Sequence, residues 1–262
     1  LFNMAVIGAI LGDIAGSQFE FDRPDNLDYK HCELFTDKCS FTDDTVMTLA
    51  VKKAILEEKD FTKTMQKIGR PYPYSGYGGR FYDWMYSSNP KPYNSFGNGS
   101  AMRVSFVGEC FEELKDVVYW AEKSAKVTHN HEEGIKGAVT TAVCIWMAKH
   151  GKSKEDIFNY VLEQYPAADY EYNITVPLDE LEKIYQWNET CMGSVAAAMR
   201  CFYESISYES FLRNVFRLKC DSDTLAAIGG AVAEEYYSGT GLEEDAILKR
   251  YLDERLYELV KR

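Results

Sequence analysis

The feature that most constrains the fold is a helical periodicity that runs from Ser100 almost to the end of the 262-residue chain. Apolar residues recur there at spacings of three and four, which is the pattern of helices with one buried face. No stretch shows the sustained alternation of apolar and polar residues expected of half-buried strands. The sequence therefore predicts an all-α protein, a bundle of many helices. We find no repeat and no linker rich in Ser and Gly, so residues 1–262 are expected to form a single domain.

The predicted helices differ in composition. They are expected at 4–16, from 44 onward, and at 61–68, 81–86, 101–107, 114–127, 132–149, 154–164, 194–204, 210–218, 224–237 and 242–260. The first is rich in Gly and Ala, which permits close packing against a neighbour although each Gly costs about 1 kcal/mol of helix propensity. Residues 69–99 are rich in Pro, Gly and aromatic residues and predict a long functional loop. Leu1, Phe2 and Asn3 precede an apparent native start at Met4 and are expected to be a cloning remnant.

The charge and cysteine content limit the classes of partner. The chain has 41 acidic and 29 basic residues and a net charge of −12, which argues against generic binding to nucleic acid or to an anionic membrane. No apolar run approaches the roughly twenty residues of a membrane span. The seven cysteines are scattered, without a C-x-x-C pair, and predict reduced thiols in a cytoplasmic protein. Nothing in the sequence indicates the oligomeric state.

Two short clusters of oxygen-bearing side chains stand at predicted helix starts that are far apart in the chain. One reads Thr42-Asp43-Asp44-Thr45 and the other Asp221-Ser222-Asp223-Thr224. Each cluster suits an N-cap, because Thr and Asp oxygens accept hydrogen bonds from the first N–H groups of a helix. Together they also offer the hard ligands that Mg²⁺ and Mn²⁺ prefer, and their four Asp carboxylates carry enough charge for two divalent cations. Capping and metal binding are compatible roles.

Three further features suit a ligand, and each has a plain structural alternative. A glycine-rich turn reads Gly97-Asn98-Gly99-Ser100-Ala101-Met102-Arg103. Its N–H groups and Arg103 suit a phosphate or diphosphate, but on this pattern alone an ordinary loop with a helix cap is favoured. Tyr72, Tyr74 and Tyr77 suit either stacking on a base or anchoring of the loop to the core. His129 suits a hydrogen bond to a phosphate or ribose, or a structural role.

Taken in order, these segments resemble the ADP-ribosylglycohydrolase family, including the dinitrogenase-reductase-activating glycohydrolases. The resemblance covers about residues 5–240. It rests on Gly8 to Asp13, Thr42 to Thr45, Gly97 to Arg103, Thr128-His129, and Asp221 to Thr224 followed by Ala226-Ala227-Ile228-Gly229. Each motif is modest, but the ordered set is specific.

The resemblance implies an all-α fold that is a compact orthogonal multi-helix bundle, with a dinuclear magnesium or manganese centre at the bottom of a cleft. The implied metal ligands are Thr42, Asp43, Asp44, Asp221, Asp223 and Thr224. Glu20 resembles the family's acidic residue that approaches the metals, and with Asp43 and Asp44 it makes up the implied catalytic set. The implied substrate-binding residues are Gly97, Asn98, Gly99, Ser100, Met102 and His129. The loop around Tyr74 to Tyr77 suits an adenine wall.

Two places depart from the family pattern. Lys219 and Cys220 stand where many relatives have two glycines, and the segment after His129 is acidic at Glu132 and Glu133. The implied activity is metal-dependent hydrolysis of the bond between C1 of the distal ribose of ADP-ribose and an attached group, on a modified protein side chain or a small molecule. A catalytically silent sensor of ADP-ribose or another nucleotide is the alternative, and a helical protein with two acidic N-caps is a third, weaker one.

Overall fold

The structure, a computed structural model, describes residues 4–57 and 60–262, so Leu1 to Asn3 lie outside the described residues. The helices of the described part, in chain order, are α1 (Met4–Ser17), α2 (Asp43–Leu56), α3 (Phe61–Gly69), α4 (Gly79–Tyr86), α5 (Gly99–Met102), α6 (Ser105–Cys110), α7 (Leu114–Lys126), α8 (Glu132–Lys149), α9 (Lys154–Gln164), α10 (Leu178–Ile184), α11 (Cys191–Tyr203), α12 (Tyr208–Phe216), α13 (Ser222–Tyr237), α14 (Glu244–Tyr251) and α15 (Glu254–Lys261). The predicted all-α class is confirmed.

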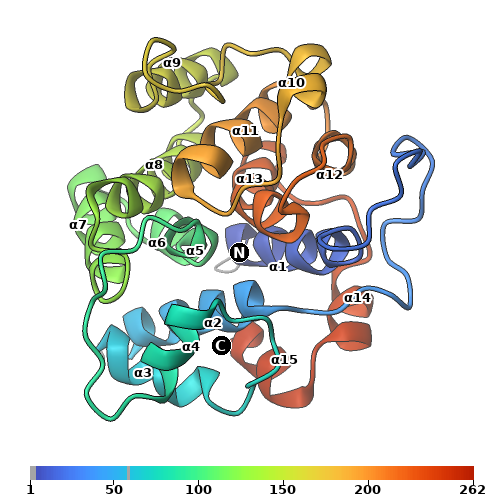
Figure 1. Cartoon of the computed structure of the whole chain (residues 1–262). Helices are drawn as coiled ribbons and strands as arrows, with labels where there is room; N and C mark the ends of the chain where they lie inside the picture. Colours follow the sequence, from blue (N-terminus) through green and yellow to red (C-terminus); the bar gives the residue numbers. More distant parts are fainter. Residues whose placement is uncertain (1–3, 58–59) are drawn as a thin grey trace.

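The helices are arranged around the pair α1 and α13 (Figure 1). Helices α8, α11 and α12 contact α13, while α2 lies against α1 and is covered in turn by α3 and α15. The buried apolar residues of these helices form one continuous core, which supports the proposal of a single domain. All seven cysteines are free thiols, as predicted. No helix within the described residues is long and apolar enough to cross a membrane.

Small residues bring α1 and α13 into backbone contact. A Cβ added at Gly8 would lie 2.5 Å from the carbonyl oxygen of Gly230, and one added at Gly12 would lie 2.3 Å from that of Ala226. A Cβ at Gly16 would lie 2.4 Å from the carbonyl oxygen of Ser222. Residue numbers increase along α1 while those of the α13 residues they contact decrease, so the two helices run antiparallel. The predicted close packing of the first helix is thus confirmed, and it places the C-terminal half of α1 against the N-terminus of α13.

Two predicted helices are divided in the structure, and one helix was not predicted. The helix expected at 101–107 is divided into α5 and α6, because Arg103 and Val104 adopt ψ near 0° and turn the chain. The helix expected at 242–260 is divided into α14 and α15, because the Asp253 side chain accepts a hydrogen bond from Leu256 N and starts a new helix. Helix α10 was not predicted, although Pro177 precedes it and two acidic residues occupy its first turn.

Candidate metal centre and ligand cleft

Asp13 holds the start of α2 against α1. Its carboxylate is fully buried and accepts hydrogen bonds from the backbone N–H of Thr42 and Thr45, at 2.8 and 3.2 Å. The hydroxyl groups of the same two threonines donate to it at 2.6 Å each. Thr42 is also the N-cap of α2, since its Oγ1 accepts from Asp44 N at 3.1 Å. The predicted cap is therefore confirmed, and Asp13 fixes its orientation.

The two predicted acidic clusters meet in space. Thr224 Oγ1 at the start of α13 donates to Asp44 Oδ2 at 2.8 Å, and Thr42 Oγ1 lies 3.3 Å from Asp223 Oδ2. Asp221 is the N-cap residue of α13 but makes no side-chain cap bond, so the side-chain cap predicted at this cluster is wrong. Its Oδ2 instead accepts a hydrogen bond of 2.9 Å from Asn98 Nδ2 in the glycine-rich turn. Residues from three distant segments thus converge on one site.

Two groups of carboxylates at this site have the spacing of a cation site. Asp13, Asp44 and Asp223 each offer an oxygen atom, and these atoms lie within 4.8 Å of one another. Glu20, Asp221 and Asp223 form a second such group with the same limit. The Oδ1 atoms of Asp221 and Asp223 are buried and have no hydrogen-bond partner among the described residues. Oxygen-rich groups with orphaned buried oxygens fit a hard divalent cation such as Mg²⁺ or Mn²⁺.

The crowding of carboxylates raises their pKa values. Burial is the main cause at Asp44 and Asp223, whose pKa values lie well above the ordinary range, and the charges of neighbouring carboxylates add to it. Burial, followed by the charges of Asp221 and Asp13, raises the pKa of Glu20 to about 8. Burial raises the pKa of Asp13 to about 6 against the lowering effect of its four hydrogen bonds. The site is thus built for positive charge.

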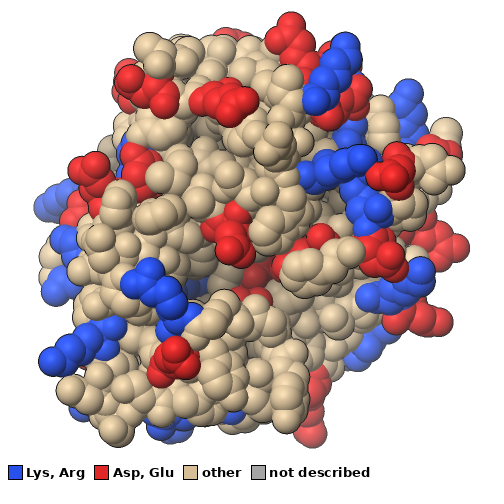
Figure 2. All heavy atoms as spheres, in the orientation of Figure 1, with Lys and Arg blue, Asp and Glu red and all other residues tan. Residues whose placement is uncertain are grey.

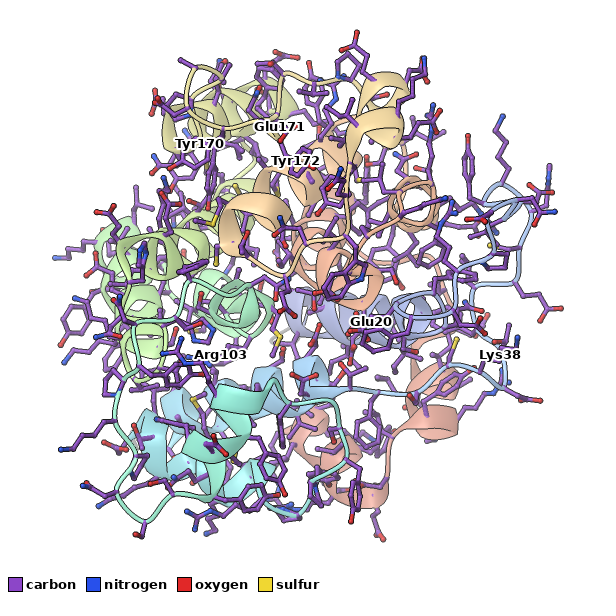
Figure 3. The ribbon with its side chains drawn as sticks, viewed as in Figure 1. Glu20, Lys38, Arg103, Tyr170, Glu171 and Tyr172 are labelled. Carbon is purple, nitrogen blue, oxygen red and sulfur yellow. The ribbon has the colours of Figure 1, made fainter. Side chains whose placement is uncertain are left out.

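The carboxylates line one end of a cleft of about 430 Å³, within the size range of small-molecule sites. Figure 2 shows the corresponding hollow near the centre of one face, with acidic side chains inside it. In Figure 3, Glu20 lies beyond the end of α1, to the right of Arg103. The lining also includes Gly76, Gly78, Gly79, Phe81, Gly97, Asn98, Gly99 and Met102.

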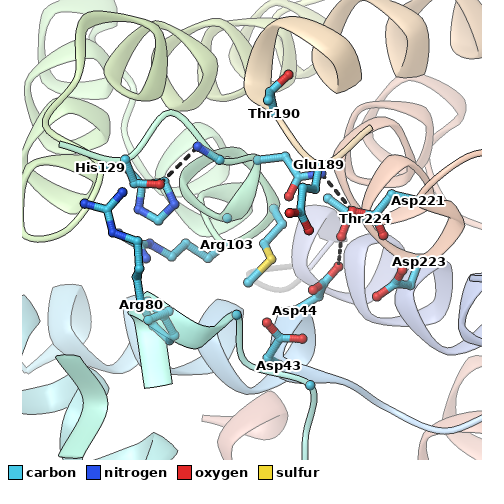
Figure 4. A pocket seen from close by; sticks show the side chains of 18 of the residues that line it. Asp43, Asp44, Arg80, Arg103, His129, Glu189, Thr190, Asp221, Asp223 and Thr224 are labelled. Carbon is cyan, nitrogen blue, oxygen red and sulfur yellow. Dashed lines mark hydrogen bonds between the residues drawn. The ribbon is translucent and has the colours of Figure 1, made fainter. Parts of the chain in front are cut away.

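The cleft has two chemically different ends (Figure 4). Asp43, Asp44, Asp221 and Asp223 lie at one end, and Arg80, Arg103 and His129 lie at the other. The glycine-rich turn runs between them and is held by the segment before α11. Gly97 forms an isolated antiparallel bridge with Thr190, and Asn98 N donates to Glu189 O at 2.8 Å. The arrangement suits a ligand with an anionic group at the cationic end of the cleft and a reacting group at the carboxylate end.

Some predicted site residues lie outside the cleft lining. The Ser100 hydroxyl donates to Gly134 O at 2.7 Å and is fully buried. Thr42 stands behind the lining, against Asp13. Arg103 lines the cleft but has no exposed surface, which leaves direct contact with a phosphate to more exposed groups. The other members of the predicted set line the cleft: Glu20, Asp43, Asp44, Gly97, Asn98, Gly99, Met102, His129, Asp221, Asp223 and Thr224.

The tyrosines considered for base stacking do not line the cleft. The hydroxyl of Tyr72 donates to Asp253 Oδ2, and that of Tyr77 donates to Gly69 O, each at 2.8 Å. Tyr74 is 98% exposed. The aromatic rings that do line the cleft are Phe21, Phe81, Tyr93, Phe96 and Trp187. Of the two roles considered for these tyrosines, Tyr72 and Tyr77 therefore anchor the loop and do not stack on a base.

Sequence reasoning missed several lining and supporting residues. Arg80 and Tyr93 fall in the unusual 69–99 segment, whose composition was the available signal. Asp13 was visible as a charge interrupting an apolar helix. Trp187 and Glu189 had no signal, because they enter the cleft only through the loop that precedes α11.

The residues that depart from the family pattern lie outside the cleft lining. Lys219 Nζ forms an exposed ion pair with Asp25 at 2.8 Å, and Cys220 is buried with its thiol toward Val215 O. Glu133 pairs with Lys136 at 3.0 Å. None of these side chains is part of the described cleft lining.

The fold and the site together define an all-helical protein with a carboxylate-floored cleft. The chain belongs to the ADP-ribosylglycohydrolase family, whose sequence profile matches residues 2–262. It is 24% identical to the human protein ADP-ribosylhydrolase ARH3 over 310 aligned residues, which cover 90% of this chain and 85% of the human protein. The mouse ADP-ribosylhydrolase ARH3 is 25% identical, with 93% of this chain and 84% of the mouse protein covered.

A solved structure of an ADP-ribosylglycohydrolase-related protein complex shares the fold. Its chain superposes on this one with a TM-score of 0.72 at 22% sequence identity. The match covers 99% of this chain and 95% of that chain.

Proposed function

We propose that this protein hydrolyses the bond between C1 of the distal ribose of ADP-ribose and an attached group. The observation that carries the proposal is the convergence of Asp44, Asp221 and Asp223 at one end of a cleft whose other end is cationic. Family membership and the resemblance to proteins named ADP-ribosylhydrolase support the same reaction class. The attached group lies beyond the part of the ligand that this cleft addresses, so a modified protein side chain and a small molecule are both proposed substrates.

The residues that would hold two Mg²⁺ or Mn²⁺ ions are Thr42, Asp43, Asp44, Asp221, Asp223 and Thr224. Such ions supply Lewis acidity and lower the pKa of a bound water. The chain itself orients the ligand: Asn98 fixes Asp221, and Gly97 and Gly99 leave room for a ligand next to His129. Arg80, exposed at the opposite end, is placed to meet a phosphate group.

Glu20 is the carboxylate proposed to handle the proton. It is half-buried, and a raised pKa suits a group that exchanges a proton near neutral pH. It stands in the loop that follows α1, with a carboxylate oxygen within 4.8 Å of an oxygen of Asp221 and of one of Asp223. A group in this place can reach both the carboxylate floor and a ligand above it. The reduced thiols support the proposal of a cytoplasmic location.

The test is release of free ADP-ribose from a panel of substrates: ADP-ribosylated arginine, serine and DNA, and O-acetyl-ADP-ribose, each with and without Mg²⁺ or Mn²⁺. Turnover of at least one substrate, dependent on the cation, is expected. Calorimetry with ADP-ribose runs beside it. Tight cation-dependent binding without product release from any substrate would identify the silent sensor and refute the hydrolase.

A further inference from the structure

Arg103 is sealed beneath the cationic end of the cleft. Its guanidinium Nη2 donates to Ser124 O at 2.6 Å and to Thr128 Oγ1 at 2.9 Å. The ring of Phe81 lies 5.9 Å from its central carbon, and the side chain has no exposed surface. Burial lowers its pKa to about 10, which leaves it charged at neutral pH. One of the two acceptors of this buried charge is the hydroxyl group of Thr128, so the other contact of that hydroxyl matters for the cleft.

The hydrogen-bond roles of Thr128 follow from its neighbours. A guanidinium has no acceptor, so Thr128 Oγ1 must accept from Arg103. The other partner of Oγ1 among the described residues is His129 Nδ1, at 2.6 Å. If the hydroxyl instead accepted from an Nδ1–H as well, its own proton would have no acceptor among the described residues, so donation of that proton to Nδ1 is the arrangement that satisfies every group. An accepting Nδ1 places the ring proton on Nε2.

The surroundings of His129 favour the neutral ring. Burial lowers the pKa of His129 well below its ordinary value, and the charges of Arg103 and Arg80 act in the same direction. A Cβ added at Gly99 would lie 3.1 Å from Nε2, and one added at Gly97 would lie 3.6 Å from it. The Nε2 atom therefore faces the two glycines that line the cleft (Figure 4).

We propose that Arg103 is a positioning residue that acts through Thr128 to hold His129 in its Nε2–H form, so that the imidazole offers a donor to a phosphate oxygen of the ligand. The nearby Arg80 selects a phosphate oxygen over a ribose hydroxyl. Its guanidinium stacks on Tyr93 with 4.8 Å from its central carbon to the ring centre, and the Tyr93 ring lies 6.1 Å from that of His129. The ligand in this inference is the ADP-ribose of the proposed function, but the form of the histidine is independent of it.

The decisive measurement is the tautomer of His129 in the ligand-free protein, read from long-range proton–nitrogen spectra after ¹⁵N-histidine labelling. The chain has four histidines, and His129→Gln assigns the signal. We expect the neutral Nε2–H form. Thr128→Val, nearly isosteric, removes the relay and should move His129 to a mixture of tautomers, whereas Thr128→Ser should restore Nε2–H. His150, whose Nδ1 contacts Trp146 O, should stay unchanged as the internal control.

Affinity for ADP-ribose, measured by calorimetry, tests the role of the donor. Thr128→Val should weaken binding in proportion to the Nε2–H fraction that is lost, about twofold for an equal mixture of tautomers, and Thr128→Ser should restore it. An Nδ1–H tautomer in the unchanged protein, or a tautomer that Thr128→Val leaves in place, overturns the proposal. A shifted tautomer with unaltered affinity overturns the donor role. Failure of the unchanged protein to bind ADP-ribose would refute the proposed function instead, because the spectra need no ligand.

Discussion

Asp43 and Asp44 are adjacent in the chain but have different surroundings. Asp44 is buried, and its Oδ2 accepts a hydrogen bond from the hydroxyl group of Thr224. Asp43 is half-buried in the cleft lining, and a Cβ at Gly76 would come within 3.4 Å of its Oδ1. The capping bond at this helix start belongs to Thr42, so neither carboxylate is needed to start α2. Their removal is therefore a test of chemistry more than of folding.

Asp43→Ala and Asp223→Ala should each abolish turnover and change the free energy of unfolding by at most about 1 kcal/mol, because removing one of several crowded carboxylates relieves repulsion. Activity assays beside thermal melts followed by circular dichroism provide the measurement. Asp60→Ala is the matched control: Asp60 caps α3 at Lys63 N, so its loss should cost about 1 kcal/mol and leave turnover intact. Full activity in both site variants would refute the metal-site assignment.

Glu20→Gln should lower kcat by roughly 10²- to 10⁴-fold while KM changes little, because the amide keeps the shape of the side chain but cannot exchange a proton. Steady-state kinetics on the best substrate of the panel measure both constants. Asp22→Asn, at an exposed position of the same loop outside the cleft lining, serves as the control for disturbance of the loop. A change confined to KM would assign Glu20 to binding instead of proton handling.

At the scale of elements, the site depends on how closely α1 approaches α13. Gly8, Gly12 and Gly16 set that distance, and Asp13 and Asp223 stand beside the contact. A wider separation would pull apart the carboxylates from the two helices. The three glycines contribute no functional group to the site, but they set the distance between the helices and therefore the spacing of the carboxylates.

Gly12→Ala should destabilise the protein by about 1–3 kcal/mol and reduce turnover as well, since the new Cβ would lie 2.3 Å from the Ala226 carbonyl oxygen. Chemical denaturation and the activity assay report the two effects. Gly79→Ala, at the first position of α4, is the control for stability because its Cβ would meet no atom within 4 Å. Unchanged stability of Gly12→Ala would show that the helices do not pack this closely.

At the scale of the whole molecule, the excess of acidic residues includes carboxyl groups buried away from the cleft. Glu109 and Glu235 have buried Oε2 atoms that no other group in the described part of the chain meets in a hydrogen bond. Burial and Glu109 raise the pKa of Glu235 from 4.5 to about 9, and burial raises that of Glu234 to about 10. The fold therefore retains protons that the unfolded chain releases.

Stability should fall as the pH rises between about 5 and 9, because over this range the folded state binds more protons than the unfolded state. Glu235→Gln removes one such group and can donate its amide N–H to Glu109, so it should flatten the dependence and stabilise the protein at alkaline pH. Thermal melts across this range measure the slope. The exposed Glu258→Gln is the control, and an equal slope in both variants would contradict the assignment.

Millimolar Mg²⁺ or Mn²⁺ should raise the unfolding temperature by about 2–5 °C, because a ligand that binds only the folded state stabilises it. Differential scanning fluorimetry with and without a chelator measures the shift. Asp223→Asn should remove most of it, since Asp223 belongs to both carboxylate groups. Identical melting in chelator and in cation would argue against a metal centre.

The sequence alone was sufficient for the all-α class, most helix positions, an N-cap within the cluster Thr42 to Thr45 and the close packing of the first helix, because these depend on local periodicity and residue type. It also indicated both acidic clusters, whose residue types are informative wherever they stand. Only the tertiary structure decided that the clusters meet, that Asp13 orients one of them, that Arg103 is sealed and that Trp187 and Glu189 enter the cleft. Those relations join residues far apart in the chain, and no local pattern encodes the helix packing that brings them together.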